Sequence, residues 1–514
     1  MNKYIKLAIA AVAGASLVTS CDLNLVPTDS IAYDESSVLI QTKANLSALE
    51  NGLFDSFRRT QNGNFVEATE FQFDGFNATV DYGNNYGALH KSDYNFTSGD
   101  YDVEDTWAYN YISIKNDNIF IAAAEKVEDE SLKANVAIVK GEAHFLRAMS
   151  YMTLARHFGK AYSANSASTD LCVPLVLVYD QAAQPARATV AEVYDQIKKD
   201  LDEAASLLAG VKGAVRAKKP TIDAINAMYA RYYLDIADYA NAAIYAHKVI
   251  DSKTYKLAST AAEMEAEYVK DEGTEPIFQL AMALSEFSYV SDPDDKSDAQ
   301  VMNSWTLALS NNTYDQVLRP YFIPTQTLVD SYDQGDLRFS AWFDGETVVN
   351  LAGNYFNVDK TDFYSFVKFF GNPSFSTTPI RNGRTSPKPI KISEMYLIAA
   401  EAELSSNPAA AKKDLNALQA ARGAAETEAT VETVRKEWFR ETAGEGLRKF
   451  CLKRWGIGFD GRAMQPGAAN VLQQGATFDG KKFEANSNYF LYPIPTHEVK
   501  LNKNLVQNPG YDSL

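Results

Sequence analysis

The sequence of 514 residues contains little cysteine, and after its N-terminus it has no long apolar run. Cys21, Cys172 and Cys451 are its three cysteines, too few for a disulfide framework in an exported chain of this length. No later segment approaches the roughly eighteen apolar residues that a membrane-spanning helix requires. We therefore predict stability from an ordinary hydrophobic core, for which 46% hydrophobic residues are ample.

Basic blocks and enzyme motifs are also absent. The net charge is −17, without a run of five basic residues, which argues against nucleic acid as a partner and against binding through an anionic membrane surface. There is no His-Glu-x-x-His, Gly-x-Ser-x-Gly or Walker motif, and the histidines show no metal-ligand spacing; they are His90, His144, His157, His247 and His497. We expect no catalytic residue, no cofactor and no metal. A surface glycoside hydrolase stays an alternative, because a pair of carboxylates needs no motif.

The N-terminus is typical of a bacterial lipoprotein. Lys3 and Lys6 precede an apolar stretch from Leu7 to Val18, and Thr19 and Ser20 place small residues directly before Cys21. We predict that residues 1–20 are a signal peptide and that Cys21 is lipidated, since acyl chains anchor a protein without a spanning helix. The alternative is an ordinary secretory signal with an incidental cysteine.

Apolar periodicity predicts helices over residues 108–127, 136–158 and 189–208. The third opens with a possible capping box, Thr189 with Glu192. Its predicted buried face carries Tyr194, Ile197, Leu201, Ala204 and Leu208.

Two further segments, 221–255 and 392–422, each have the pattern of a helix pair. Small residues stand where two helices would touch, and turns are expected at Asp238-Tyr239 and at Asn407-Pro408. This spacing resembles a tetratricopeptide repeat, whose helix pairs must stack to bury their apolar faces. The sequence predicts a helical scaffold.

Residues 60–106 and 285–390 lack helical periodicity and are rich in aromatic residues. Insertions of this length usually carry function. Sugars are bound by aromatic rings that stack on pyranose faces, beside amides and carboxylates that bond the hydroxyl groups. The first region supplies this mixture, and its candidate ligand residues are Asp74, Asn77, Tyr82, Asn85 and Tyr86. Trp107, where a helix begins, is interpreted as a core residue.

Five segments, in order, resemble motifs of the SusD/RagB family. They are CDLNLVPTD at the lipidation site, KGEAHFLRAMSYMTLARHFGKAY, RPYFIPTQTLVDSYDQGDLRF, EWFRETAGEGLRKFCLKRWG, and the closing LYPIPTHEVKLNKNLVQNPGY. The chain departs from the family at Trp438, Cys451 and Lys503, positions that belong to scaffold motifs.

This resemblance implies a fold and a role. The fold would be mainly α, a tetratricopeptide-like helical-repeat scaffold whose long, loop-rich, aromatic insertions form the ligand surface. Members are lipid-anchored glycan-binding proteins of Bacteroidota that capture oligosaccharides or polysaccharides, without catalysis, beside a SusC-like TonB-dependent outer-membrane transporter. The chain would then lie in the outer membrane and face the exterior, with an N-terminal region at 21–270 and a C-terminal region at 271–514. A scaffold that stabilises the transporter and binds no sugar is a further alternative.

The resemblance also implies particular residues. The family's ligand surface combines the first loop with the insertion that corresponds to residues 285–345, which adds Tyr289, Trp305 and Tyr314 as candidates. The charged helix residues of the fourth motif are interpreted as structural ion pairs; they are Arg440, Glu441, Glu445, Arg448 and Lys453. Residues 486–511 are predicted to be a terminal brace, in which prolines hold an extended path and amides bond the backbone.

Overall fold

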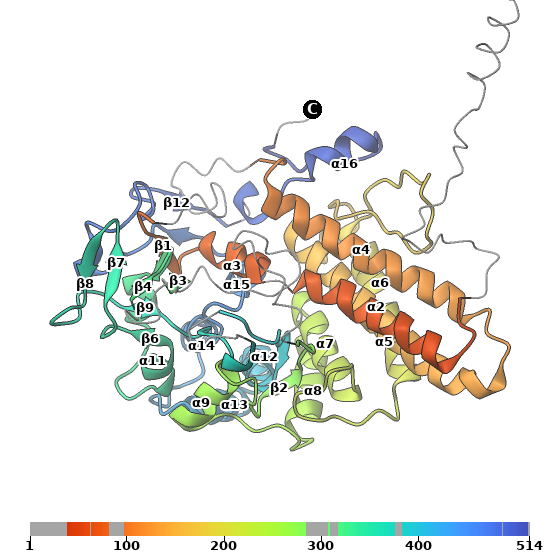
Figure 1. The fold of residues 1–514 in the computed structure, drawn as a ribbon, viewed down its shortest axis with the longest axis horizontal. Coiled ribbons are helices and arrows are strands. Elements are labelled where there is room, and N and C mark those ends of the chain that lie inside the picture. Colours follow the sequence, from red (N-terminus) through yellow and green to blue (C-terminus); the bar gives the residue numbers. More distant parts are fainter. Residues whose placement is uncertain are drawn as a thin grey trace, which may run out of the picture.

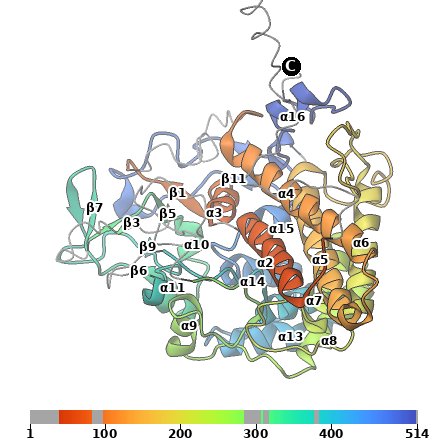
Figure 2. The ribbon, with the colours of Figure 1, turned by 45° about the vertical axis from the view of Figure 1, so that its right-hand side comes forward.

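The computed structural model is mainly helical and describes residues 39–61, 63–81, 97–283, 307–308, 317–375, 383–485 and 487–511. Cys21 and the predicted signal peptide lie outside these residues. Figure 1 shows long helices gathered on one side of the molecule and short strands on the other, and the turned view of Figure 2 keeps the same division. The predicted fold class, a helical scaffold with less regular insertions, is confirmed.

The N-terminal helices are α2 (Lys43–Thr60), α3 (Gly63–Phe71), α4 (Tyr101–Ala124), α5 (Glu130–Phe158) and α6 (Val190–Leu207). The helices expected over 108–127 and 136–158 are α4 and α5, and both begin earlier than their apolar periods do. Asp129 caps α5 by accepting a hydrogen bond from the backbone N–H of Ser131. Capping and first-turn acidic residues extend a helix beyond its apolar face, because they satisfy or complement its free N–H groups.

The N-terminal cap of α6 is the one that the sequence predicts. The Thr189 side chain accepts a hydrogen bond from the Glu192 backbone N–H, and the Glu192 carboxylate accepts one from the Thr189 backbone N–H. This confirms the predicted capping box. The predicted apolar face is also buried throughout; it consists of Tyr194, Ile197, Leu201, Ala204 and Leu208.

Gly141 lets α6 approach α5 closely. A Cβ atom at this position would lie 2.8 Å from Leu208 Cγ and 2.9 Å from Leu207 Cβ. These distances are too short for a non-bonded contact, so a side chain here would push the end of α6 away from α5.

The two predicted helix pairs are both present and stack on each other. α7 (Ile222–Asp235) and α8 (Tyr239–Ile250) form the first pair, and α12 (Ile392–Glu403) and α13 (Pro408–Ala421) form the second. α12 packs against both α8 and α7. Asp238 caps α8 and Asn407 caps α13, at the predicted turns. The small residues at the contacts are fully buried; they include Ala227, Ala230, Ala242 and Ala246.

Shorter helices complete the described chain. They are α9 (Ala261–Tyr268), α10 (Gln326–Val329), α11 (Leu337–Trp342), α14 (Val431–Glu441), α15 (Arg448–Trp455) and α16 (Thr496–Leu501), with 3-10 turns at Pro373–Phe375, Pro466–Ala468 and Asn488–Phe490. None of the helices in the described ranges combines the length and the apolar character needed to cross a bilayer.

The strands are short and form small separate sheets. β1 (Phe76–Ala78) pairs with β5 (Phe322–Pro324), β2 (Pro276–Phe278) with β10 (Ile390–Lys391), β6 (Phe343–Asp344) with β9 (Ser365–Phe366), and β11 (Phe459–Asp460) with β12 (Lys482–Phe483). A four-stranded sheet has the order β3 (Leu307–Ala308), β4 (Leu318–Arg319), β7 (Val349–Leu351) and β8 (Asn354–Phe356). The regions expected to lack periodicity therefore contain strands, and α3 and the start of α4 lie within residues 60–106.

The C-terminal segment docks on the end of α5. Asn508 donates hydrogen bonds to the carbonyl oxygens of Phe158 and Tyr492, and it accepts one from the Arg187 guanidinium. Asn502 donates to the carbonyl oxygen of Pro185. These contacts match the predicted brace, in which amides bond the backbone; the segment also includes one short helix, α16, which the sequence did not indicate.

Candidate functional site

Asp74, a predicted ligand residue, forms a buried ion pair at the base of the first loop. The Arg448 guanidinium, at the start of α15, donates to both carboxylate oxygens over 2.8 and 2.6 Å. Burial opposes ionisation of Asp74, but the charge and hydrogen bonds of Arg448, together with a backbone hydrogen bond and the charge of Arg462, hold the pKa of the carboxyl below its ordinary value. The Asp74 carboxylate therefore joins the segment before β1 to the helical scaffold.

Asn77, the next predicted ligand residue, lies in β1 with no solvent exposure. Its amide donates a hydrogen bond to the carbonyl oxygen of Ala463 over 3.3 Å. In this structure Asp74, whose side chain is 12% exposed, and Asn77, which is fully buried, are bonded within the protein at the base of the loop. The other candidates lie outside the described residues; they are Tyr82, Asn85, Tyr86, Tyr289, Trp305 and Tyr314.

The described residues do show where the two aromatic segments join the fold. β1 runs antiparallel to β5, with Ala78 opposite Phe322. The pairing continues at Thr79, whose backbone N–H donates to the Tyr321 carbonyl and whose hydroxyl donates to the Pro320 carbonyl, both over 2.8 Å. The segment that leads into residues 82–96 therefore lies beside the segment that follows residues 309–316.

The second insertion joins the fold at a second point, in the neighbouring four-stranded sheet. β3, which begins two residues after Trp305, pairs antiparallel with β4, with Leu307 opposite Arg319. β4 lies directly before the Pro320 and Tyr321 carbonyls that bond Thr79. Segments separated by more than two hundred residues in the chain thus meet at one corner of the molecule, beside β1, β3 and β4 in Figure 1.

A β-hairpin borders this corner and supplies an aromatic residue that the sequence analysis missed. The backbone N–H of Ala352, in the turn between β7 and β8, donates to the Asp81 carboxylate over 3.1 and 3.2 Å. Tyr355 on β8 is 62% exposed. The turn has positive φ at Ala352 and Gly353, as a two-residue hairpin requires. Alternation in VNLAGNYF was the sequence feature that could have indicated it.

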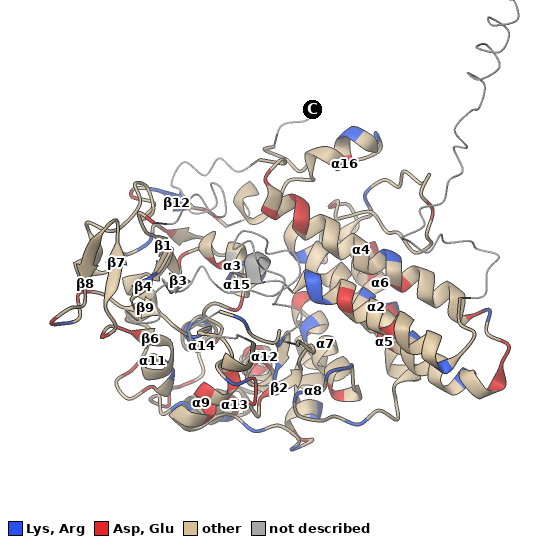
Figure 3. Ribbon diagram, in the orientation of Figure 1, with Lys and Arg blue, Asp and Glu red and all other residues tan. Residues whose placement is uncertain are grey.

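The corner has an apolar support, with charged side chains at Arg319 of β4 and at Asp81. Beneath the hairpin lies a separate cluster of buried residues, which includes Leu318, Ile323, Val349, Leu351 and Phe363. β1, β5, β7 and β8 contain no charged residue. Figure 3 shows β1, β7 and β8 in tan, and it shows Lys, Arg, Asp and Glu over the helices and in several loops.

The charged motif of α14 and α15 is structural, as predicted. The Arg338 side chain has no exposure and bonds Asp336, Glu437 and Glu441 over 2.6 to 2.8 Å. Arg422 pairs with Glu441 over 2.6 Å. Trp107, interpreted as a core residue, is confirmed as such with 3% exposure, and Trp438 in the scaffold motif is also 3% exposed. Paired, buried charges of this kind tie helices together and are not available to a substrate.

A cavity of about 170 Å³ lies inside the scaffold, bordered by residues of α5, α7, α12 and the 385–391 segment. Ligand pockets usually measure about 300–1,000 Å³. Its cationic lining residues are already paired: Arg156 with Asp235, Arg231 with Glu394, Lys388 with Asp271, and Lys391 with Glu445. In the described part of the chain, this cavity therefore does not offer a site for an oligosaccharide.

Two family models together match residues 28–511. Residues 230–511 match the model of the SusD family, and residues 28–234 match a model described as SusD-like, "Starch-binding associating with outer membrane". None of the curated proteins matches the chain.

Solved structures share the fold over almost the whole chain. A SusD superfamily protein from Bacteroides thetaiotaomicron is 22% identical, with 91% of this chain and 100% of that chain covered and a TM-score of 0.73. A SusD-like carbohydrate binding protein from Bacteroides vulgatus is 21% identical, with 92% of this chain and 99% of that chain covered and a TM-score of 0.70. A laminarin binding SusD-like protein is 20% identical, with 92% of this chain and 100% of that chain covered, and its TM-score is also 0.70.

Proposed function

The chain belongs to the SusD family of glycan-binding proteins, and from this premise we propose that it captures an oligosaccharide or polysaccharide at the cell surface and passes it to a SusC-like TonB-dependent transporter. In this role the chain binds and releases its ligand and breaks no bond. The family description "associating with outer membrane" supports the location. The likeness to a laminarin binding protein supports a glycan as the ligand class.

One structural observation carries the proposal. The β1–β5 pairing and the β3–β4 pairing place one end of each aromatic insertion at one corner, beside the exposed Tyr355. A shallow sugar surface needs several rings on one face of the molecule, which two loops that start from one corner can supply. We assign the stacking role to Tyr82, Tyr86, Tyr289, Trp305 and Tyr314, and hydrogen bonding to Asn85.

Asp74 and Asn77 take a different part in this proposal. Their side chains face the Arg448 guanidinium and the Ala463 carbonyl, respectively. They would support the loop from below and would not contact the glycan. Tyr355 replaces them as the described residue that stacks on the sugar, because its ring is exposed on a supported hairpin.

Affinity electrophoresis against a panel that includes laminarin, starch and host glycans tests the binding step. Trp305→Ala, Tyr82→Ala and Tyr355→Ala should each weaken binding about tenfold or more, which corresponds to ~1.4 kcal/mol. Tyr239→Ala is the matched control, since Tyr239 is a 45% exposed ring on the helical scaffold. Its affinity should equal that of the unchanged chain.

The outcomes separate the three functions considered for this chain. Retarded migration that the loop variants lose supports capture, whereas equal retardation of all variants contradicts the assigned surface. Reducing ends released from any glycan would indicate a hydrolase. No retention by any glycan, together with co-purification of a SusC-like barrel, would indicate a scaffold without sugar binding.

Anchoring and transfer need separate tests. Cys21→Ala should move the protein from the outer-membrane fraction to a soluble one, because the acyl chains supply the membrane affinity. Protease added to whole cells should degrade the unchanged protein if it faces the exterior. Uptake of the bound glycan should fail when either this chain or the SusC-like transporter is deleted.

A further inference from the structure

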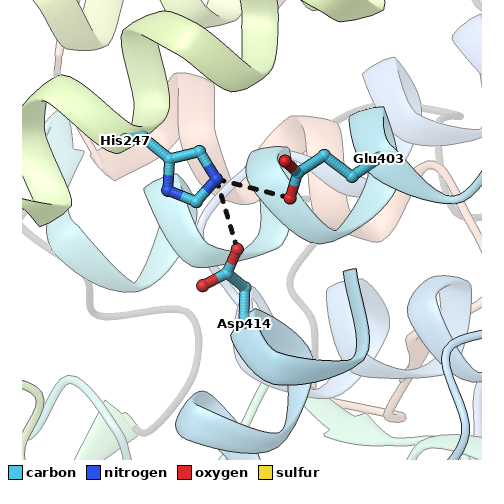
Figure 4. Close-up of side chains that lie close together, drawn as sticks. All are labelled: His247, Glu403 and Asp414. Carbon is cyan, nitrogen blue, oxygen red and sulfur yellow. Dashed lines mark hydrogen bonds and ion pairs between the residues drawn. The ribbon is translucent and has the colours of Figure 1, made fainter. Parts of the chain in front are cut away.

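His247, Glu403 and Asp414 come together in the helical scaffold, on helices that do not belong to the proposed glycan surface. They belong to α8, α12 and α13, so each of the three stacked helices supplies one side chain. His247 Nε2 lies 3.3 Å from Glu403 Oε2 and 3.5 Å from Asp414 Oδ2, as Figure 4 shows. The candidate ligand atoms all lie within 4.8 Å of one another.

The hydrogen bonds at this cluster leave one carboxylate oxygen unsatisfied. The Asp414 side chain is only 4% exposed, and its Oδ2 atom has no hydrogen-bond partner. His247 Nε2 carries at most one hydrogen, which serves Glu403 Oε2 at the shorter distance. A buried carboxylate oxygen without a partner costs free energy, and a second carboxylate nearby adds repulsion. A divalent cation among the three groups would remove both costs.

We propose that His247, Glu403 and Asp414 bind a Zn²⁺ ion. Zinc takes imidazole nitrogen and carboxylate oxygen at about 2.0–2.2 Å in a tetrahedral arrangement, which sets neighbouring ligand atoms roughly 3.3 Å apart. The two distances from His247 Nε2 are close to that value. Ca²⁺ and Mg²⁺ prefer oxygen ligands alone, so the imidazole favours zinc.

The position of the cluster indicates what the ion does. His247 lies in the last turn of α8, Glu403 ends α12, and Asp414 is in the middle of α13. The ion would therefore join the first tetratricopeptide-like pair to the second. A fourth position would be open to water, since the His247 side chain is 29% exposed. The site is a structural clamp on the scaffold and does not depend on glycan binding.

Calorimetric titration with ZnCl₂ tests the site on the chain from Asp22 to Leu514, produced without a histidine tag and freed of metal by a chelator. We expect one ion per chain and a melting temperature that rises with zinc concentration, because a ligand of the folded state stabilises it by mass action. Co²⁺ in place of zinc should give the visible absorption bands of a tetrahedral site. Ca²⁺ should give no comparable shift.

Variants locate the binding. His247→Ala and Asp414→Asn should each weaken zinc binding at least tenfold, and circular dichroism without zinc shows whether they fold. His497→Ala is the control, because His497 is exposed on α16 away from the cluster. Absence of stoichiometric binding to the unchanged chain overturns the proposal. So does a His247→Ala protein that binds zinc as tightly as the unchanged chain.

Discussion

At the scale of single residues, the described chain places several full charges in its interior. Arg338, Arg422 and Arg440 are each at most 2% exposed, and carboxylates surround all three. A buried pair adds little net stability compared with an apolar pair of the same shape, but loss of one partner leaves an uncompensated charge. Individual residues of this network should therefore be intolerant of truncation.

Replacing Arg338 tests this directly. Arg338→Ala leaves Asp336, Glu437 and Glu441 without their shared cation, and we expect the free energy of unfolding to fall by about 3–5 kcal/mol. Guanidinium denaturation measures it. Lys133→Ala breaks an exposed pair with Glu130 and should change the value by less than about 1 kcal/mol. Similar losses in both variants would contradict the structural role of the network.

Glu70 makes the stability depend on pH. Burial raises the pKa of its carboxyl to about 7, although backbone N–H groups of residues 444–448 act in the opposite direction. The folded state favours the neutral form of Glu70. Its contribution to the free energy of unfolding is therefore full below the ordinary pKa of 4.5 and is lost as the pH rises through 7.

Glu70→Gln should remove this dependence. At about 1.4 kcal/mol per pH unit, the unchanged chain should lose up to ~3 kcal/mol between pH 5 and pH 8 relative to the variant. Urea denaturation of both proteins at the two pH values measures the difference in slope. Parallel stability curves would show that Glu70 titrates normally.

At the scale of elements, helices and loops depend on contacts from distant parts of the chain. The C-terminal brace satisfies carbonyl groups at the end of α5, where a helix has no internal donors left. The β7–β8 hairpin similarly depends on Asp81, from the first loop, for one of its turn N–H groups. Each element is thus completed by another that lies far away in the sequence.

Substitution of each of two asparagines by alanine tests the role of the C-terminal brace. Asn508→Ala removes hydrogen bonds to the Phe158 and Tyr492 carbonyls and leaves the Arg187 guanidinium with one acceptor fewer, so we expect a loss of about 2–3 kcal/mol in unfolding free energy. Asn504→Ala removes one bond, to the Gln184 carbonyl, at an exposed position. The unfolding free energy of this variant should fall by less than about 1 kcal/mol. Thermal unfolding of both variants distinguishes the buried brace from an ordinary tail.

At the scale of the whole molecule, the regions 21–270 and 271–514 interlock. β1 pairs with β5, α8 packs on α12, and Asp74 pairs with Arg448, so each contact crosses residue 270. The two family models instead meet at residues 230–234, within α7. We propose that the two regions fold as one cooperative unit.

Separate production of the two regions tests this proposal. Residues 21–270 alone should lack a cooperative thermal transition, because the apolar face of α8 would lose α12. Mixing with residues 271–514 should restore a transition. A fragment that melts cooperatively by itself would show that residue 270 separates independent domains.

The helical scaffold could be predicted because its determinants are local. The Thr189 capping box, the Asn407 cap and the alanines of the helix pairs act within a few residues of their own positions. The site was less predictable. Asp74 lies in a segment with the composition of a sugar-binding loop and was therefore predicted to bind the ligand. Its ion-pair partner, Arg448, is 374 positions away in the sequence. Tyr355 lies in a region without helical periodicity, and the sequence did not single it out as a ligand residue.

The sequence by itself determined the capped starts of α6, α8 and α13 and the motifs that identify the family, and it predicts an export signal. These depend on neighbouring residues, whose order is visible along the chain. The tertiary structure alone decided which polar side chains are buried, and that the bases of two aromatic insertions meet at β1 and β5. It also brought His247 to Glu403, 156 positions away. Burial and proximity arise when distant segments pack, and no local pattern encodes them.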